Sequence, residues 1–276
     1  MKKKILAIAM TALMVVGVAA CGSSSSSSTT DSNSTDTTAD GMTGQISVIS
    51  REEGSGTRGA FVELMGIVDD SDNDITTIDA EITNSTSVML TTVAGNKQSI
   101  GYVSLGSLSD DVKAVKVDGV EASVDDIKNG SYSVSRPFLV AYKDGQLSEL
   151  AQDYLKYILS SDGQAIISEN GYISVSDSAE AYTASGLSGK LVLAGSTSVS
   201  PVMEKLADAY KALNPDVTIE IQQTGSGAGI TSAIEGVCDF GMSSRELKES
   251  EAAELKSEQI ALDGIAVIVN NENPTE

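Results

Sequence analysis

The chain has 276 residues, of which 41% are hydrophobic but only 4% aromatic, so mostly small side chains must fill any core. Histidine is absent and there are two cysteines, which excludes Ser-His-Asp and Cys-His catalytic sites and argues against a structural zinc site. The formal net charge of −21 argues against nucleic acid or an anionic membrane surface as a partner, since both would repel the chain.

Residues 1–20 have the pattern of a bacterial lipoprotein signal peptide. Residues 2–4 are lysines, and the apolar run that follows is too short for a membrane-spanning helix. The run ends in Val18-Ala-Ala-Cys21, which resembles a lipobox, the motif whose cysteine is acylated and becomes the first residue of the mature chain. We therefore expect a lipid anchor on Cys21 at the extracytoplasmic face of the cell membrane. An ordinary secretory signal with a coincidental cysteine is the alternative.

Residues 21–44 consist mainly of Ser, Thr, Asp and Asn and offer almost nothing that a core could bury. This composition predicts a disordered tether between the anchor and a folded part. If Cys21 is lipidated, Cys238 has no partner for a disulfide within the chain. We expect Cys238 to be a small buried residue.

From residue 45 onward, short apolar runs alternate with segments of helical periodicity. This alternation predicts an α/β fold with largely parallel sheets. Residues 174–188 are polar and irregular, and we expect them to connect two segments. The predicted strands are 46–49, 99–105, 136–142, 191–194, 217–222 and 265–270, and the predicted helices are 59–66, 86–93, 149–169, 201–213 and 230–235.

A turn rich in Gly, Ser and Thr precedes a helix three times, at residues 50–58, 195–201 and 224–229. The first N–H groups of a helix have no intrahelical acceptor, and the helix dipole adds about half a positive charge there. Glycines let an anion approach the backbone, hydroxyls add donors, and Arg51 would add a bidentate charged clamp. If the three helix starts converge, they form a cage for an anion. A single turn of this kind would be interpreted as an ordinary N-cap, where Ser and Thr are common.

An acidic run between residues 69 and 74 invites comparison with a calcium loop. Its spacing lacks the glycine and the closing glutamate that such a loop requires, so we interpret Asp69, Asp70, Asp72 and Asp74 as a solvated loop. We expect neither a metal site nor a cofactor. Without histidine or a metal cluster, a phosphatase or another enzyme is disfavoured, and we predict that the protein is not an enzyme.

Four segments together resemble the binding motifs of the periplasmic phosphate-binding proteins of ABC transporters. Ser50-Arg-Glu-Glu-Gly-Ser-Gly-Thr-Arg58 is similar to the phosphate-loop signature of that family. The similarity runs from about residue 45 to residue 276. The other three segments are Ala194-Gly-Ser-Thr-Ser-Val-Ser-Pro201, Gln223-Thr-Gly-Ser-Gly-Ala-Gly229 and Asp239-Phe-Gly-Met-Ser-Ser-Arg245.

The resemblance implies a type II periplasmic binding protein fold, with two α/β lobes that close around a phosphate in the cleft between them. It implies a receptor, expected to be monomeric, that captures inorganic phosphate and delivers it to the permease of an ABC importer. Arg51 would pair with phosphate oxygens. Hydroxyl or backbone donors would come from Ser55, Gly56, Thr57, Thr197, Ser198, Ser226 and Ser244.

One departure from the family pattern concerns selectivity. Well-known members resemble this chain around Ser244 but have an aspartate there, which accepts the proton of HPO₄²⁻ and so rejects fully ionised sulfate. A serine hydroxyl donates as well as accepts, which makes Glu53 or a backbone carbonyl the candidate acceptor. A receptor for sulfate, molybdate or a phosphorylated metabolite is therefore an alternative. A phosphate sensor without transport and a surface adhesin are the others.

The second departure is the order of the segments, because the Ser-Arg-Glu-Glu half comes first here and later in the usual family arrangement. The chain therefore resembles a circular permutation, with residues 45–135 as one lobe and 136–276 as the other. Residues 136–142 would form a hinge strand, and 265–270 would lead to a second crossing. The family pattern continues with a helical stretch after this point, so we expect either that the first lobe lacks a helix or that the chain is a fragment.

Overall fold

The computed structural model describes residues 44–275, and the structural statements below refer to this part of the chain. The predicted signal peptide at 1–20, Cys21 and nearly all of the predicted tether at 21–44 lie outside the described residues. Within 44–275, no helix combines the length and the apolarity needed to cross a membrane.

The described strands form one mixed 10-stranded sheet in the order β2-β1-β3-β10-β5-β9-β7-β8, with β4 and β6 also paired to β10. The predicted α/β class is confirmed, but the expectation of largely parallel sheets is wrong. β1 is parallel to β2 and β3, and β7 to β8 and β9, whereas β10 is antiparallel to every partner. Apolar runs mark where strands lie without giving their direction. The strands are β1 (Ser47–Arg51), β2 (Glu81–Thr83), β3 (Ser99–Ser104), β4 (Val112–Ala114), β5 (Ser135–Tyr142), β6 (Ile173–Ser174), β7 (Gly189–Gly195), β8 (Val217–Gln223), β9 (Phe240–Ser243) and β10 (Lys256–Asn270).

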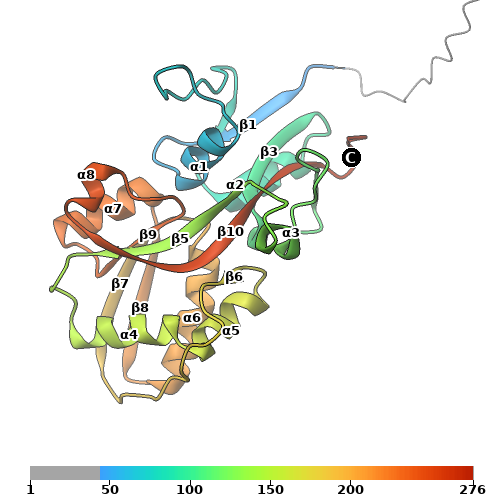
Figure 1. The fold of residues 1–276 in the computed structure, drawn as a ribbon. Helices are drawn as coiled ribbons and strands as arrows, with labels where there is room; N and C mark the ends of the chain where they lie inside the picture. The colour runs from blue at the N-terminus through green and yellow to red at the C-terminus, as the bar shows by residue number, and fades with distance from the viewer. Residues whose placement is uncertain (1–43, 276) are drawn as a thin grey trace, which may run out of the picture. The chain divides into compact units, whose positions relative to one another are not determined.

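The long strand β10 joins the two halves of this sheet (Figure 1). Its first part pairs with β5 up to Gly264, and its second part pairs with β3 from Ile265 onward. The apolar run predicts a strand only over 265–270, because the first four residues of β10 are exposed and polar. We call β1–β4 with the second part of β10 the first sheet half. The second sheet half is β5–β9 with the first part of β10.

Helices connect most of the parallel strands. Two of them start earlier than the apolar periodicity predicts, α1 at Gly56 and α7 at Ser226, so both binding turns contribute residues to a first helical turn. The predicted helix 149–169 is two helices that meet at Ser160, whose side chain caps the second. The helices are α1 (Gly56–Leu64), α2 (Thr86–Ala94), α3 (Val124–Lys128), α4 (Glu149–Leu159), α5 (Ser161–Glu169), α6 (Ser200–Leu213), α7 (Ser226–Glu235) and α8 (Glu249–Ala252), with a 3-10 turn at Leu105–Ser107.

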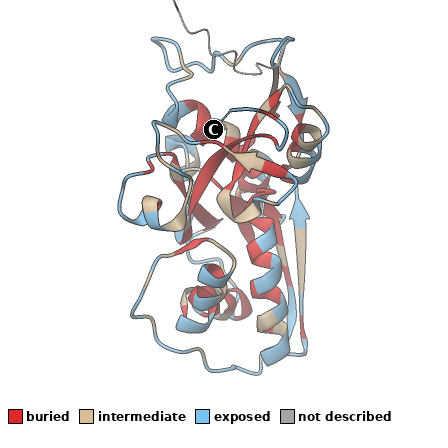
Figure 2. Cartoon of the chain, turned by 90° about the vertical axis from the view of Figure 1, so that its right-hand side faces the viewer, coloured by how far each residue is buried: buried red, intermediate tan, exposed pale blue. Residues whose placement is uncertain are grey.

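Buried residues follow the strands, while most loops are exposed (Figure 2). In the first sheet half, α2 packs on the sheet through Met89 and Val93, which are fully buried. In the second half, a larger core includes Phe138, Tyr154 and Tyr210. Burying an apolar side chain of this size contributes about 1.5–3 kcal/mol. Each sheet half therefore has a core of its own.

The connector that precedes β7 is held in place by the carboxylate of Asp153 on α4. Asp153 Oδ2 accepts hydrogen bonds from the hydroxyls of Tyr182 at 2.5 Å, Tyr210 at 2.6 Å and Ser185 at 2.8 Å. Burial would raise the pKa of Asp153, but these hydrogen bonds outweigh it and lower the pKa. The polar segment after β6 is thus irregular, as the sequence predicts, yet anchored at Tyr182 and Ser185.

Cys238, expected to be buried, is half-buried in the structure and forms no disulfide within residues 44–275. Burial, together with the charge of Asp239, raises the pKa of its thiol to about 11. The thiol is therefore protonated at neutral pH and has little nucleophilic character.

Candidate anion-binding site

The segments that follow five strands meet at one place between the two sheet halves. In the first half, Arg51 at the end of β1 is in register with Thr83 at the end of β2. In the second half, Gly195 at the end of β7 is in register with Gln223 of β8 and Met242 of β9. Parallel strands end at the same edge of a sheet, and crevices at such edges bind ligands in α/β proteins. The sheet topology therefore groups the predicted binding turns within each half, and contacts across the halves, such as Thr57 Oγ1 to Ser198 Oγ at 2.9 Å, bring the two groups together.

A first cluster of hydroxyls lies where α1 meets the start of α6. Thr57 Oγ1 and Ser198 Oγ are 2.9 Å apart, although the two residues belong to different sheet halves. Thr86 Oγ1, at the start of α2, is 3.2 Å from Ser198 Oγ and 3.2 Å from Thr197 Oγ1. All four side chains are buried.

A second cluster lies where α7 meets the end of β9. Ser244 Oγ is 3.0 Å from Ser196 Oγ and 3.4 Å from Ser226 Oγ, and the Ser244 N–H donates to Ser226 Oγ at 3.2 Å. Gly56 faces this cluster, since a Cβ atom at Gly56 would lie 2.4 Å from Ser226 Oγ and 2.7 Å from Ser244 Oγ. Only glycine therefore fits at position 56 without moving two buried hydroxyls.

Arg51 supplies the positive charge of the site. Arg51 as a whole is 2% exposed, and its guanidinium donates to the Glu52 carboxylate through Nε at 2.8 Å and Nη2 at 2.9 Å. Nη2 also donates to Thr197 Oγ1 at 3.1 Å. The expected acceptor Glu53 is exposed, whereas the neighbouring Glu52 is the partner of Arg51.

The loop of Gly54 touches the start of α7 across the two sheet halves. The Gly227 N–H donates to the Gly54 carbonyl at 2.9 Å. A Cβ atom at Gly227 would lie 3.3 Å from Gly54 Cα, which is tighter than an ordinary contact. These two glycines therefore allow a direct backbone contact beside the hydroxyl clusters.

A buried ion pair lies behind Ser244. Arg136 on β5 donates to Asp263 Oδ2 through Nε at 3.2 Å and Nη2 at 3.1 Å, and through Nη1 to the Ser244 carbonyl at 3.2 Å. Asp263 Oδ1 accepts from Ser104 Oγ at 2.8 Å. Burial raises the pKa of Asp263, and the charge of Arg136 opposes that rise. The pair links β3, β5 and β10 to a residue of the site.

Seven of the eight residues that the resemblance selects lie in or against the two clusters. These seven are Arg51, Gly56, Thr57, Thr197, Ser198, Ser226 and Ser244. The eighth, Ser55, is buried and caps α1, where its Oγ accepts from the Arg58 N–H at 3.3 Å. Because Ser55 Oγ is the acceptor in that bond, its hydroxyl hydrogen remains able to donate to another group.

Sequence reasoning missed Thr86, Ser196 and the pair Arg136–Asp263. A signal for Thr86 exists, because Asn84-Ser-Thr-Ser87 is another hydroxyl-rich turn before an apolar helix. Ser196 lies inside a quoted motif. Nothing in the sequence links Arg136 to Asp263, which are 127 positions apart.

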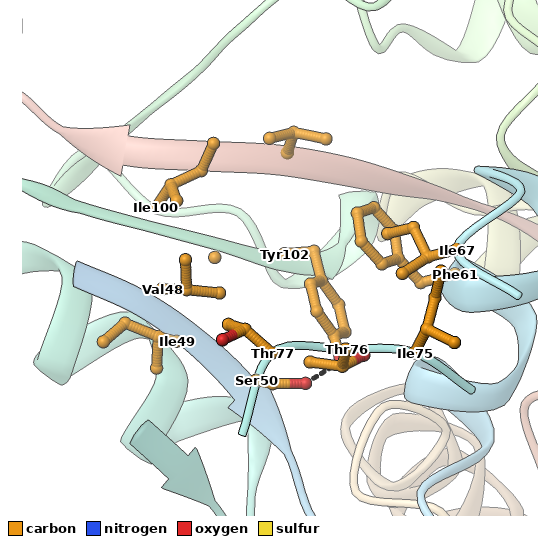
Figure 3. A pocket seen from close by; sticks show the side chains of 12 residues that line it. Val48, Ile49, Ser50, Phe61, Ile67, Ile75, Thr76, Thr77, Ile100 and Tyr102 are labelled. Carbon is orange, nitrogen blue, oxygen red and sulfur yellow. Dashed lines mark hydrogen bonds between the residues drawn. The ribbon is translucent and has the colours of Figure 1, made fainter. Parts of the chain in front are cut away.

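A pocket of about 240 Å³ lies beside the site, and its chemistry is different (Figure 3). Its lining is mainly apolar and includes Val48, Phe61 and Ile75, with no charged residue among the lining side chains. Tyr102 separates this pocket from the site, because its hydroxyl is 2.9 Å from Ser50 Oγ and accepts from the Arg51 N–H at 3.2 Å. The pocket offers no counter-charge for an anion.

Comparison with known proteins places these features in a family. A family model described as a PBP superfamily domain matches residues 15–162 and 178–276. Phosphate-binding protein PstS 2 of Streptococcus agalactiae is 50% identical over 278 residues, covering 99% of this chain and 90% of that protein. Its namesake in Streptococcus pneumoniae serotype 4 is 47% identical over 274 residues, covering 98% of this chain and 90% of that protein.

A solved structure gives the same result for the fold. It is the crystal structure of the phosphate-binding protein of a phosphate ABC transporter from Streptococcus pneumoniae TIGR4. The TM-score is 0.66 and the identity 51%, over 84% of this chain and 91% of that one. The two Streptococcus sequences match almost the whole chain in one continuous stretch, so they have the segments in the same order as this chain.

Proposed function

Because this chain belongs to the phosphate-binding proteins of ABC transporters, within the PBP superfamily, we propose that its two hydroxyl clusters and Arg51 form the binding site for inorganic phosphate. The protein captures phosphate outside the cytoplasm for import by an ABC transporter. In this site, Arg51 pairs with phosphate oxygens. The remaining donors are Ser55, Gly56, Thr57, Thr197, Ser198, Ser226 and Ser244.

The burial of the hydroxyls supports this assignment most strongly. Thr57, Thr197, Ser198, Ser226 and Ser244 are each at most 5% exposed. Burying a hydroxyl without a full set of partners costs about 1–3 kcal/mol, so a core that only had to pack would use apolar residues here. Side chains that donate to a tetrahedral anion account for this concentration of polar groups.

The electrostatics of Arg51 fit the same assignment. Within residues 44–275, Glu52 and Thr197 engage Nε and Nη2, which leaves the two N–H groups of Nη1 for an anion. Charge-assisted hydrogen bonds of this kind contribute about 1.5–3 kcal/mol each. The starts of α1, α6 and α7 add oriented amides and dipoles, which attract an anion without any further full charge.

Capture by closure of two lobes is the proposed mechanism. We take residues 45–135 and 136–276 as the lobes, because β1–β4 fall in the first range and β5–β9, apart from Ser135, in the second, while β10 contributes to both sheet halves. The contacts Thr57–Ser198 and Gly54–Gly227 join the two ranges. Closure around phosphate would exclude water, which strengthens each hydrogen bond to it.

The proposal also covers delivery of phosphate to the permease and attachment of the protein to the membrane. The closed, monomeric receptor docks on the permease subunits of its importer, carries no catalytic activity of its own, and is held to the membrane by a lipid on Cys21. The lipobox-like end of the apolar run supports the anchor. Radiolabelled fatty acid should be incorporated into the wild-type chain but not into Cys21→Ser, and equal labelling of both would refute the anchor.

Sulfate or molybdate as the cargo is the second candidate, favoured by one observation. No aspartate or glutamate among residues 44–275 is hydrogen-bonded to the Thr57, Ser198, Ser226 or Ser244 hydroxyls, so no carboxylate there selects a protonated anion. A hydroxyl oxygen can also accept a hydrogen bond from the P–OH group of HPO₄²⁻ if the hydroxyl turns, and this is how we expect phosphate to be accommodated.

Isothermal titration of the chain from residue 22 onward with phosphate, sulfate and molybdate in turn tests the assignment. We expect phosphate to bind at least ten-fold more tightly than sulfate and molybdate, which corresponds to about 1.4 kcal/mol or more. Tighter binding of sulfate or molybdate would transfer the function to that anion. Binding of none of the three would refute the oxyanion site altogether.

A further inference from the structure

We infer that Thr86 is a further phosphate-binding residue and that the start of α2 is a fourth helix terminus directed at the anion. This inference rests on the proposed function and extends the site by a segment that none of the recognised binding motifs contains. The observation behind it is the position of the Thr86 hydroxyl, 3.2 Å from both Thr197 Oγ1 and Ser198 Oγ.

The sheet topology explains why α2 starts at the site. β2 is parallel to β1, and Thr83 at its end is in register with Arg51. Two further contacts hold the strand ends together: Glu52 N–H donates to the Thr83 carbonyl at 3.0 Å, and Thr83 Oγ1 donates to the Ser50 carbonyl at 3.2 Å. The three residues that follow β2 therefore emerge beside the loop that begins with Arg51.

Burial within this short segment singles out one residue. Asn84, Ser87 and Val88 are exposed and Ser85 is half-buried, but Thr86 is only 6% exposed. Thr86 lies three residues before Met89, so it is on the buried face of α2. Packing on that face would be served by an apolar side chain and does not explain the hydroxyl.

Helix capping does not explain Thr86 either, because its neighbour performs that task. Ser85 is the N-cap residue, and its side chain accepts from the Val88 N–H at 3.2 Å. Thr86 is the first residue of a nine-residue helix, so its own N–H has no intrahelical acceptor. Its amide is thus available at the positive end of the α2 dipole, beside the hydroxyl that contacts Thr197 and Ser198.

The hydroxyl of Thr86 also connects two groups that we assign to phosphate. Arg51 can only donate, so Thr197 Oγ1 accepts from Nη2 and keeps its hydrogen for Thr86 or for the anion. Thr86 in turn contacts Ser198, which contacts Thr57. Removing the Thr86 hydroxyl would take away one donor and leave Thr197 and Ser198 without a shared partner.

Calorimetric titration with inorganic phosphate tests this role through a matched set of variants. Thr86→Val keeps the shape of the side chain and removes the hydroxyl, whereas Thr86→Ser keeps the hydroxyl and removes a methyl group. Thr91→Val is the control on the same helix, since Thr91 is exposed and its hydroxyl donates to the Ser87 and Val88 carbonyls of α2 itself. We expect at least a ten-fold loss of affinity in Thr86→Val, at most a three-fold loss in Thr86→Ser and none in Thr91→Val.

Two outcomes would overturn the inference. One is wild-type affinity in Thr86→Val; the other is an equal loss in Thr86→Val and Thr86→Ser, which would assign the effect to packing. Thermal unfolding without phosphate should give the same midpoint for wild type and Thr86→Val. If Thr86→Val does not fold, Thr86→Ala is titrated with phosphate instead. The proposed function fails separately, if wild type does not bind phosphate or if Arg51→Ala binds it normally.

Discussion

Arg51 brings a permanent positive charge to a place where the neighbouring donors are hydroxyls and backbone amides. Its side chain is 3% exposed, and Glu52 compensates its charge while still leaving Nη1 for another partner. A guanidinium also has the planar fork that matches two oxygens of a tetrahedral anion. The charge of Arg51 and the planar shape of its guanidinium therefore contribute separately to phosphate affinity.

Substitutions at Arg51 and Thr57 measure these contributions. Arg51→Ala and Thr57→Val should each lower phosphate affinity at least ten-fold, because each removes a buried donor to the anion. Arg51→Lys should fall between wild type and Arg51→Ala, since lysine keeps the charge but loses the fork. Thr57→Ser, which keeps the hydroxyl that contacts Ser198, is the control and should bind nearly as well as wild type.

The contradictory result is wild-type affinity in both Arg51→Ala and Thr57→Val, measured by calorimetry. It would show that phosphate binds away from these side chains. If phosphate affinity falls in Arg51→Ala but not in Thr57→Val, the charge of Arg51 binds phosphate without help from the Thr57 hydroxyl. That result would contradict the role of Thr57.

At this scale the sequence predicts residue types better than partners. The turn 50–58 suggests an Arg, a Ser, a Gly and a Thr in the site. Arg51, Gly56 and Thr57 lie in or against the two hydroxyl clusters, whereas Ser55 caps α1. The turn does not indicate which of the two glutamates, Glu52 or Glu53, contacts Arg51. Which neighbour turns toward Arg51 depends on the backbone direction after β1, and the structure shows Glu52 paired and Glu53 exposed.

Elements meet at the site because strand ends and helix starts coincide. α1 and α2 begin shortly after β1 and β2, which end at one edge of the first sheet half, and α6 and α7 begin shortly after β7 and β8, which end at one edge of the second. The helix starts are readable from Gly, Ser and Thr patterns. The start of β10 is not readable in this way, because its first four residues are polar and exposed and are recognised as strand from their pairing with β5.

The Arg136–Asp263 pair is the clearest element-scale prediction, because it joins β5 to β10 behind Ser244. Asp263→Ala leaves a fully buried guanidinium without its counter-charge, and we expect a loss of about 3–5 kcal/mol in the free energy of unfolding. Chemical denaturation followed by circular dichroism measures it. Phosphate affinity should fall as well, since Arg136 also holds the Ser244 carbonyl at 3.2 Å.

A surface pair offers the matched control. Lys190 and Glu220 join β7 to β8 in the same way, but both side chains are about half exposed, so Glu220→Gln should leave the unfolding midpoint and the phosphate affinity unchanged. An Asp263→Ala protein as stable as wild type would contradict the structural role of the buried pair.

For the molecule as a whole, the sequence predicts the class of fold and the convergence of its binding turns, but not how the strands run. Strand direction depends on long-range pairing, as in β10, which lies beside β5 at one end and β3 at the other. The permuted order of the halves and their boundary near residue 135 stay predictions. The order of the two halves along the chain does not affect the proposed site. The site requires only that the strand ends of both sheet halves lie close to the same place.

A crystal structure of the protein grown with phosphate would show whether Arg51 and the two hydroxyl clusters hold the anion. We expect one phosphate between the two sheet halves, within about 3.2 Å of Arg51 Nη1 and of the Thr57, Thr197, Ser198, Ser226 and Ser244 donors. A well-ordered phosphate bound elsewhere, with these side chains still bonded only to one another, would contradict it.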